Sequence, residues 1–466
     1  MSKRTLQICL AAAILTAAVG YYVFSHMKQG GNPFSGLRRQ STKVDFGIPY
    51  ARFKDAETLR SARSEELVTE VKAVIRQEGL PADVFVDDKT QTNNIAVTLY
   101  NLFFQFYDPQ NPDDTLEKLW EASPIGVWNI SEQTLDSVRT EIEKLEPIRQ
   151  AIRTMLLQSD TRFYYIFVYP ESLKTGQDVG TKINTDASGY LSDYALLEEY
   201  AIARALHEGD LTEATNALSY IFRITKLASH IGNVGARSDA AQTRLRTYDI
   251  MQQVILDPKF DRNQMLFLQK MLQAQYDDWP SEYRTWFGDR ASGIIVYHRL
   301  MLYESSEVLE EAEYNDLLNR TDLRTFSRGF LKYREADQAF YLRSMQSILD
   351  ISEEPLSKRW NVLDQINGEL FRKEGLRDEQ GIAMEPFVAH ILLKDVDKLM
   401  RLFARDRSAL NRALVLMRSS LGQSNTDRFR DPFTDAPYEI QKVDGFHSIT
   451  TSTLQNPFRV PIFVEQ

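Results

Sequence analysis

The sequence predicts a mainly α-helical protein with an N-terminal transmembrane helix, an irregular multi-helix body that contains an antiparallel hairpin, and a small C-terminal β module. Three observations predict this class: an uncharged apolar run at residues 8–24, helical periodicity over most of residues 57–421, and a final segment rich in aromatic and β-branched residues. They divide the chain into a transmembrane anchor (1–28), a tether (29–56), an all-α helical body (57–421) and a small β tail (422–466).

The anchor is predicted from the apolar run between Ile8 and Phe24, which follows Lys3 and Arg4. As a helix this run would extend about 26 Å, close to the thickness of a hydrocarbon core, about 30 Å. A cleaved signal peptide is the alternative, with residues 18–20 as the cleavage site. We favour an uncleaved anchor that contacts the membrane through residues 8–24, because the run continues into aromatic residues typical of the membrane interface.

The orientation of the anchor is not fixed by charge, because Lys28, Arg38 and Arg39 after the run balance Lys3 and Arg4 before it. We expect a single-pass protein with its N-terminus in the cytoplasm and its body exported. The basic residues after the run also match a segment that binds anionic lipid headgroups. We interpret them instead as part of a solvated tether, because glycines and a proline interrupt them.

Charge and cysteine content exclude several classes of function. The chain has a formal net charge of −10, which argues against nucleic acid as a partner. Its single cysteine, Cys9, lies within the apolar run. The body is therefore expected to hold neither a disulfide nor a thiolate metal site.

The body begins with helical periodicity that is clearest between residues 131 and 158, where one apolar stripe predicts a single helix bent at Pro147. An aromatic and β-branched stretch at residues 162–169 predicts a strand. Turn and breaker residues, Gly288 among them, separate the remaining periodic segments. Helices are predicted at residues 238–256, 263–276, 291–319, 325–349, 355–373 and 384–421.

A helical hairpin is predicted between residues 190 and 230. The first helix ends at Gly209, and Asp210 with Glu213 three residues later has the pattern of an N-terminal capping box for the second helix. Basic Arg223 and Lys226 stand among the apolar residues of that second helix. The pair resembles a tetratricopeptide unit, but no second copy follows at a fixed spacing, so a solenoid is not predicted.

The C-terminal segment, residues 429–466, is too apolar for a solvated extension and is predicted to fold as a short β unit. Asp444-Gly445 is a typical hairpin turn. Because an isolated hairpin is only marginally stable, we expect this unit to dock on the last helix of the body near Leu410, Leu414 and Met417.

Four local patterns give the chain a resemblance to a known group. They are Asn93-Asn94-Ile95-Ala96 leading into Leu99-Tyr100, Thr161-Arg162-Phe163, Ala203-Arg204-Ala205-Leu206 with Glu208-Gly209-Asp210, and Asp431-Pro432-Phe433-Thr434. In these features the chain resembles a group of uncharacterised, membrane-anchored, mostly helical proteins of planctomycete bacteria. The resemblance implies a helical fold and membrane anchoring, but no activity. The chain departs from the group at Asp435, where glycine is usual. It also ends in residues 450–466 where the group has a polar, glycine-rich C-terminus.

The run from Asp431 to Phe433 also resembles the loop that precedes the final hairpin of type II secretion pseudopilins. Those proteins carry a glutamate just inside their apolar helix, whereas the first acidic residue here is Asp45. We therefore interpret the segment as a β module rather than as part of a pilin subunit.

Motifs for catalysis, cofactor binding and metal binding are lacking, so the sequence nominates no catalytic, cofactor or metal residue. His207 falls near the predicted hairpin turn, and His230 ends the second helix about 30 Å away, so the two cannot share a metal. We interpret both as solvated or capping residues. The acidic pairs 198–199, 277–278, 310–311 and 353–354 are interpreted as solvated helix faces.

The aromatic segment from Trp279 to Arg290, which includes Arg284, has the composition of an interface anchor, although we interpret it as a packed corner between helices. These observations favour a single-pass, membrane-anchored, non-catalytic protein-interaction or scaffold module with other proteins as partners. Two alternatives remain. One is an enzyme whose site comes from residues distant in sequence, such as a metal-dependent hydrolase, and the other is an accessory protein of a secretion apparatus.

Overall fold

The structure is a computed structural model. It describes residues 85–86, 94–107, 113–122, 131–163, 165–166, 179–299, 323–370, 376–377, 383–384, 387–423, 426–449 and 458–463, which are mostly helical. The predicted anchor at residues 8–24 and the tether at 29–56 lie outside these ranges. Within them, no helix has both the length and the apolar character needed to cross a bilayer. The mainly α class is therefore confirmed for the described residues, and the anchor stays a prediction.

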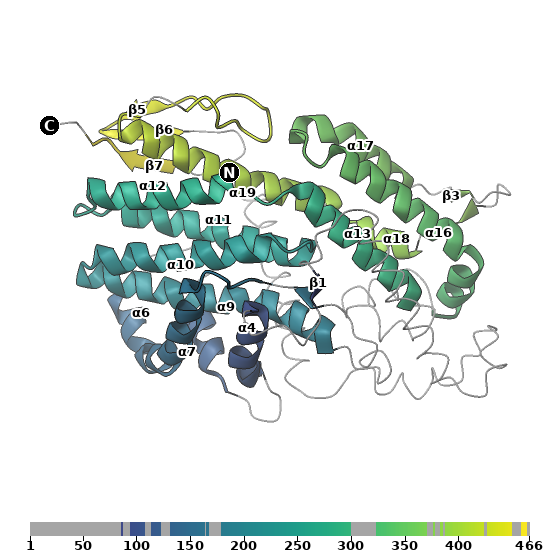
Figure 1. Cartoon of the computed structure of the whole chain (residues 1–466), viewed down its shortest axis with the longest axis horizontal. Helices are drawn as coiled ribbons and strands as arrows, with labels where there is room; N and C mark the ends of the chain where they lie inside the picture. The colour runs from purple at the N-terminus through teal and green to yellow at the C-terminus, as the bar shows by residue number, and fades with distance from the viewer. Residues whose placement is uncertain are drawn as a thin grey trace, which may run out of the picture.

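Long antiparallel helices form the centre of the described fold (Figure 1). Helices α9, α10 and α11 pack in sequence order, while α12 lies against α10 and α19. The predicted helices at residues 238–256 and 263–276 are confirmed to within a few residues. The bounds are Val179–Glu208 for α9, Leu211–Ser229 for α10, Val234–Leu256 for α11, Arg262–Asp277 for α12 and Val396–Ser420 for α19.

The hairpin of α9 and α10 is confirmed, although α9 begins earlier than predicted. Gly209 has a φ of 72°, and the N–H groups of Gly209 and Asp210 donate to the carbonyls of Leu206 (3.2 Å) and Ala205 (2.7 Å). This is the Schellman arrangement that ends helices at glycine. The Asp210 side chain accepts from the backbone N–H of Glu213 (3.0 Å) and so caps α10.

We expect Gly209→Val to destabilise the protein by about 1–2 kcal/mol, because a left-handed backbone strains a residue that has a Cβ. A Cβ at Gly209 would meet only the flexible end of Lys259, so the loss comes from backbone strain rather than from packing. Asp210→Ala should cost about 1 kcal/mol by removing the cap. Urea unfolding of the full chain in detergent measures both. Gly189→Val, an exposed α9 position with nothing near its added Cβ, is the control and should not destabilise. Parental stability of Gly209→Val would contradict the assignment.

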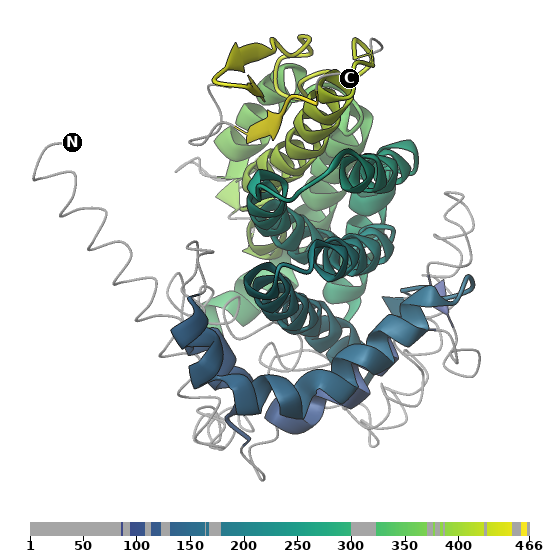
Figure 2. The same cartoon turned by 90° about the vertical axis from the view of Figure 1, so that its left-hand side faces the viewer.

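The N-terminal helices cross the central stack at a steep angle, as Figure 2 shows with the stack seen nearly end-on. The single helix predicted at residues 131–158 was wrong: it is divided at Val138, which leaves the helical region (φ −117°, ψ 16°) and is buried. Pro147 lies inside the second helix. The bounds are Ile95–Phe103 for α4, Phe104–Tyr107 for the 3-10 helix η3, Thr115–Ala122 for α5, Glu132–Ser137 for α6 and Arg139–Leu157 for α7.

Of the strand predicted at residues 162–169, the structure describes residues 162–163 and 165–166. Tyr165–Ile166 form β2, which pairs in parallel with β1, Phe85–Val86. Asn94 forms a further parallel bridge with Arg162. The first described residues of the chain, 85–86 and 94, thus lie beside residues 162–166.

A second group of helices packs around α19 on the other side of the molecule (Figure 1). The helix predicted at 291–319 was placed too late, because α13 already begins at Glu282 and contains Gly288; residues 300–322 lie outside the described ranges. The predicted 384–421 helix is divided between α18 and α19 at Lys394 and Asp395. The bounds are Glu282–Arg299 for α13, Leu323–Ile351 for α16, Leu356–Leu370 for α17 and Phe387–Leu393 for α18, with Leu376–Arg377 (β3) paired to Ala383–Met384 (β4).

The C-terminal β unit is confirmed as a three-stranded antiparallel sheet of β5 (Gln441–Val443), β6 (Phe446–Ile449) and β7 (Phe458–Pro461). Asp444 and Gly445 both have positive φ, 49° and 80°, as their type I′ turn requires. The side chain of Gln252 on α11 bonds to both backbone groups of Arg459, at 2.6 Å each. This amide satisfies the backbone N–H and C=O of one residue on the free edge of β7, and it attaches the sheet to the helices.

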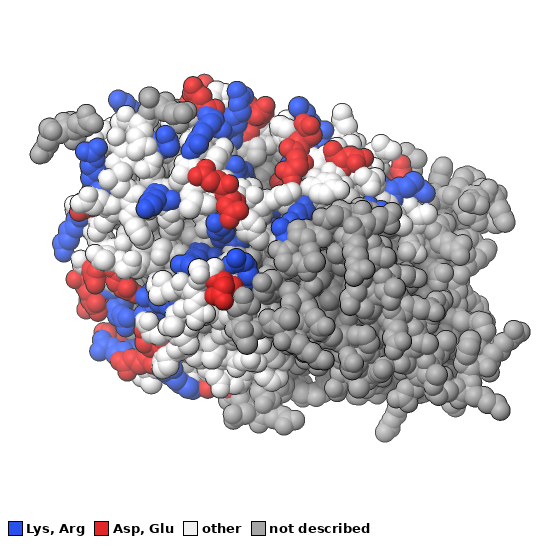
Figure 3. All heavy atoms as spheres, in the orientation of Figure 1, with Lys and Arg blue, Asp and Glu red and all other residues white. Residues whose placement is uncertain are grey.

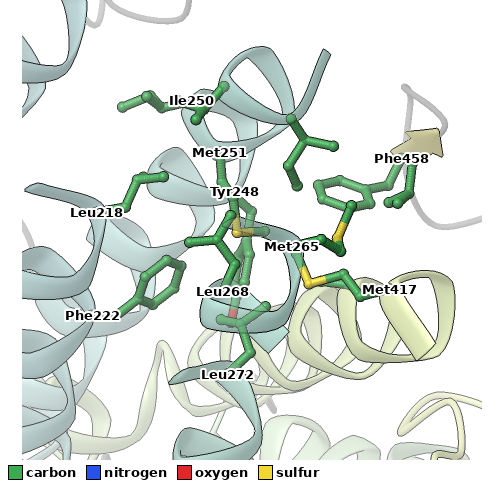
Figure 4. Packing of buried hydrophobic residues seen from close by; sticks show 14 of the residues in the cluster. Leu218, Phe222, Tyr248, Ile250, Met251, Met265, Leu268, Leu272, Met417 and Phe458 are labelled. Carbon is green, nitrogen blue, oxygen red and sulfur yellow. The ribbon is translucent and has the colours of Figure 1, made fainter. Parts of the chain in front are cut away.

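The sheet docks where predicted. Ile449, Phe458 and Val460 belong to the same buried cluster as Leu410, Leu414 and Met417 of α19. Figure 4 shows this core, with Phe458 and Met417 pointing toward Met265 between the sheet and the helices. The cluster continues to the hairpin through side chains of α10, α11 and α12, so one core joins the β unit to the central stack. Those labelled in the same figure are Leu218, Phe222, Tyr248, Ile250, Met251, Leu268 and Leu272.

Candidate binding cleft

One acidic pair that was predicted to be solvated is buried instead. Glu198 on α9 is fully buried and accepts hydrogen bonds from Nη1 of Arg149 (3.1 Å), Nε of Arg153 (2.7 Å) and the hydroxyl of Tyr194 (2.7 Å). The prediction was wrong here because both arginines come from α7, far away in the sequence. The pairs at 277–278 and 353–354 are exposed as predicted, and 310–311 lies outside the described residues.

Two further buried carboxylates have raised pKa values. Glu199 accepts a hydrogen bond from Nε of Arg246 (2.7 Å), and burial raises its pKa to about 8. Asp193 accepts from Nε1 of Trp120 (2.8 Å) and from the hydroxyl of Tyr107 (2.7 Å), and burial raises its pKa to about 6. Such shifts are typical of catalytic groups but also of structural ion-pair networks. Both side chains are covered and link α9 to its neighbours, so we interpret them as structural.

Glu199 gives a pH prediction. Its pKa is about 8 in the fold against 4.5 ordinarily, so its stabilising contribution is fully present below about pH 4.5 and is lost as the pH rises through about 8. Glu199→Gln should remove a decline of about 1 kcal/mol per pH unit between pH 5 and pH 8. Thermal melts across this range measure the slope. Glu208→Gln, at an exposed position of α9, is the control. An unchanged slope in Glu199→Gln would contradict the prediction.

The two histidines lie where the sequence placed them, His207 in the last turn of α9 and His230 at the far end of α10. His207 is exposed near the hairpin turn, and His230 is the residue at which α10 ends. Nε2 of His230 lies 3.1 Å from the backbone oxygen of Asp278, and burial lowers the pKa of this imidazole. In the described part of the chain, no three His, Cys, Asp or Glu side chains are grouped so as to hold a metal ion.

His230 lies in a cleft that three separate segments enclose. The C-terminal end of α7 with the turn after it forms one wall, the end of α10 forms the second, and the α12–α13 junction forms the third. The cleft has a volume of about 550 Å³, within the usual range for ligand sites. It is lined by Leu156, Gln158, Ser159, Thr161, Arg162, Phe163, Arg223, Lys226, Leu227, His230, Ile231, Asp278 and Arg284.

The charge of this lining is predominantly positive. The basic side chains are Arg162, Arg223, Lys226 and Arg284, and the acidic one is Asp278. Asp278 is already bound to Nζ of Lys226, at 2.7 Å. Nη1 of Arg162 donates to two backbone carbonyls of its own turn, those of residues 159 (3.1 Å) and 161 (2.9 Å), which fixes its guanidinium at the edge of the cleft.

The floor of the cleft is apolar. Leu156, Phe163 and Ile231 are buried, and Leu227 is partly buried beside them. All four pack in the cluster that holds α4, α7 and α9 together. The cleft therefore presents positive charge at its rim and an apolar lining beneath it that packs on the core.

The sequence analysis singled out several residues of this cleft but did not predict that they lie close together. Arg223 and Lys226 stood out as basic residues on the hairpin, the 161–163 pattern as part of a resemblance, and Arg284 as part of an aromatic segment. That segment is packed as predicted, with Trp286 and Phe287 buried: residues 279–281 form the corner between α12 and α13, and residues 282–290 form the first half of α13. No local pattern indicates that α7, α10 and α13 converge, because each contact joins residues far apart in sequence.

Comparison with known proteins adds no relative: no family model, no curated protein and no solved structure matches this chain.

Proposed function

We propose that this chain is a membrane-anchored, non-catalytic interaction module that binds a partner protein through the cleft between α7, α10 and α13. The observation that carries the proposal is the combination of a basic rim and an apolar floor in one open cleft. Protein interfaces typically combine these features, with arginine and apolar side chains in the buried part of the contact.

The polar groups in the cleft favour binding over catalysis. The backbone oxygen of Asp278 is bonded to His230, and its carboxylate is paired with Lys226. A general base needs a partner proton within hydrogen-bond reach and an orienting group behind it. Here His230 and Asp278 serve instead to fix the end of α10 against the end of α12.

The interaction is tested by affinity capture from detergent-solubilised membranes with the full chain as bait. We expect a specific set of proteins to be captured by the parent, lost with Arg223→Glu and retained with Lys270→Glu. Both residues are exposed basic positions, but Lys270 lies on α12 outside the cleft. A captured set that is the same for all three baits would overturn the role of the cleft.

The anchor has its own test. The full-length protein should sediment with membranes and resist carbonate extraction, because the apolar run at residues 8–24 is long enough to span a bilayer. A chain that starts at Phe46 should remain in the supernatant. Release of most of the full-length protein by carbonate would contradict anchoring, and protease protection in spheroplasts would separately decide the orientation.

A further inference from the structure

We infer that the cleft recognises an acidic peptide segment, in which carboxylate side chains alternate with aliphatic ones. This inference rests on the proposed function and names the chemistry of the partner. It is supported by three properties of the cleft: the sign of its charge, the position of its apolar surface, and the small extent of its positive field.

The charge requires an anionic ligand. Arg223 on α10 is exposed, and Arg162 is held at the opposite wall with Nε and Nη2 not engaged by its two carbonyl contacts. Asp278 does not offset these arginines, because Lys226 already pairs with it. Guanidinium groups bind carboxylates through two parallel hydrogen bonds, which makes them stronger and more directional partners than lysine.

The floor requires an apolar group next to that anion. Phe163 follows Arg162 in the turn after α7, and Leu227 lies on α10 with Arg223, so each arginine-bearing wall also contributes an apolar side chain that packs on the core. A free inorganic anion would leave this surface wet, whereas an aliphatic side chain would bury it. An extended peptide places successive side chains on opposite sides, so carboxylates and aliphatic groups in alternation reach the rim and the floor together.

A peptide fits better than a membrane surface because the positive field is local. The chain as a whole carries a net charge of −10, and both signs are interspersed over the described face seen in Figure 3. A bilayer would contact a wide area and so would meet a surface of the net negatively charged chain, not the basic cleft alone. A short segment inside the cleft experiences mainly the arginines, because salt screens charges beyond about 8 Å.

The test uses the full chain in nonionic detergent and a short fluorescent peptide of alternating aspartate and leucine. Fluorescence anisotropy should give saturable binding that weakens with added salt. Arg223→Glu should weaken it at least about tenfold, Arg223→Lys much less, and Lys270→Glu not at all. The same peptide with asparagine in place of aspartate, and one with serine in place of leucine, should each bind at least about tenfold more weakly.

Failure of this inference is distinguishable from failure of the proposed function. Equal binding of the aspartate and asparagine peptides, or no binding of either, would overturn the acidic ligand. If capture of proteins still depended on Arg223, the interaction module would stand with a different ligand. Binding to phosphatidylserine vesicles by a chain that starts at Phe46, lost in Arg223→Glu while the peptide does not bind, would assign the cleft to lipid headgroups and overturn the inference.

Discussion

Replacing Gly288 with alanine is expected to destabilise the protein by about 3 kcal/mol or more, the upper range for an overpacked core. Gly288 lies inside α13, where it passes directly over the turn between α10 and α11. A Cβ built at this position would lie 1.6 Å from the backbone oxygen of Gly232 and 2.4 Å from its carbonyl carbon. The obstacle is main chain, which cannot rotate aside as a side chain would, so α13 must move away from the stack.

That movement would also disturb the packing beside it. Trp286 and Phe287, the two residues before Gly288, are almost completely buried, and the ring of Trp286 lies 6.0 Å from that of Phe403 on α19. Gly368→Ala in α17 is the matched control, because nothing lies within 4 Å of its added Cβ. A helical glycine of that kind should gain up to about 1 kcal/mol on replacement by alanine. Chemical unfolding of both variants gives the comparison, and equal effects would contradict the close crossing.

Local rules predicted the elements whose cause is local. Gly209 and Asp210 supply a left-handed turn and a cap within two residues, and Asp444-Gly445 supplies a hairpin turn in the same way. For such segments the fold only confirms what the residues dictate. The same rules were wrong for Gly288, which they predicted to separate two helices but which lies within α13. Position 288 must be glycine because the backbone of Gly232 lies where a Cβ would be. This requirement arises only from the packing of α13 on the central helices, so the sequence alone does not show it.

Long-range partners explain the other differences. In the sequence, the acidic pair of Glu198 and Glu199 is typical of a solvated helix face. Glu198 is buried because α7 packs against α9 and supplies two arginines that bind its carboxylate. The cleft arises in the same way, since its arginines come from α10, α13 and the turn after α7. A single sequence gives the charge and periodicity of each segment. Which segments converge depends on how whole helices pack, and that information is spread over the entire core.

Asp406→Ala is expected to cost about 3–5 kcal/mol, because it would leave the charge of Arg244 buried and unpaired. Both side chains are 1% exposed. Nε of Arg244 donates to both carboxylate oxygens of Asp406, at 3.0 and 3.1 Å. Its Nη1 donates to the carbonyl of Thr225 (2.9 Å) and to the hydroxyl of Ser229 (2.6 Å). One guanidinium on α11 thus joins α10 to α19, and through α19 the second group of helices.

A double variant separates the value of the pair from the penalty of breaking it. Arg244→Met combined with Asp406→Leu removes both charges, and it should regain most of the stability lost in Asp406→Ala, since apolar replacements of a buried ion pair are often neutral. Glu354→Ala, which breaks an exposed pair with Lys358 at 2.9 Å, should change stability by less than about 1 kcal/mol. Chemical unfolding of the three variants measures these differences. If Asp406→Ala were as mild as Glu354→Ala, the pair would not hold α10, α11 and α19 together. If the double variant were no more stable than Asp406→Ala, the loss would come from packing around Asp406 rather than from a stranded charge.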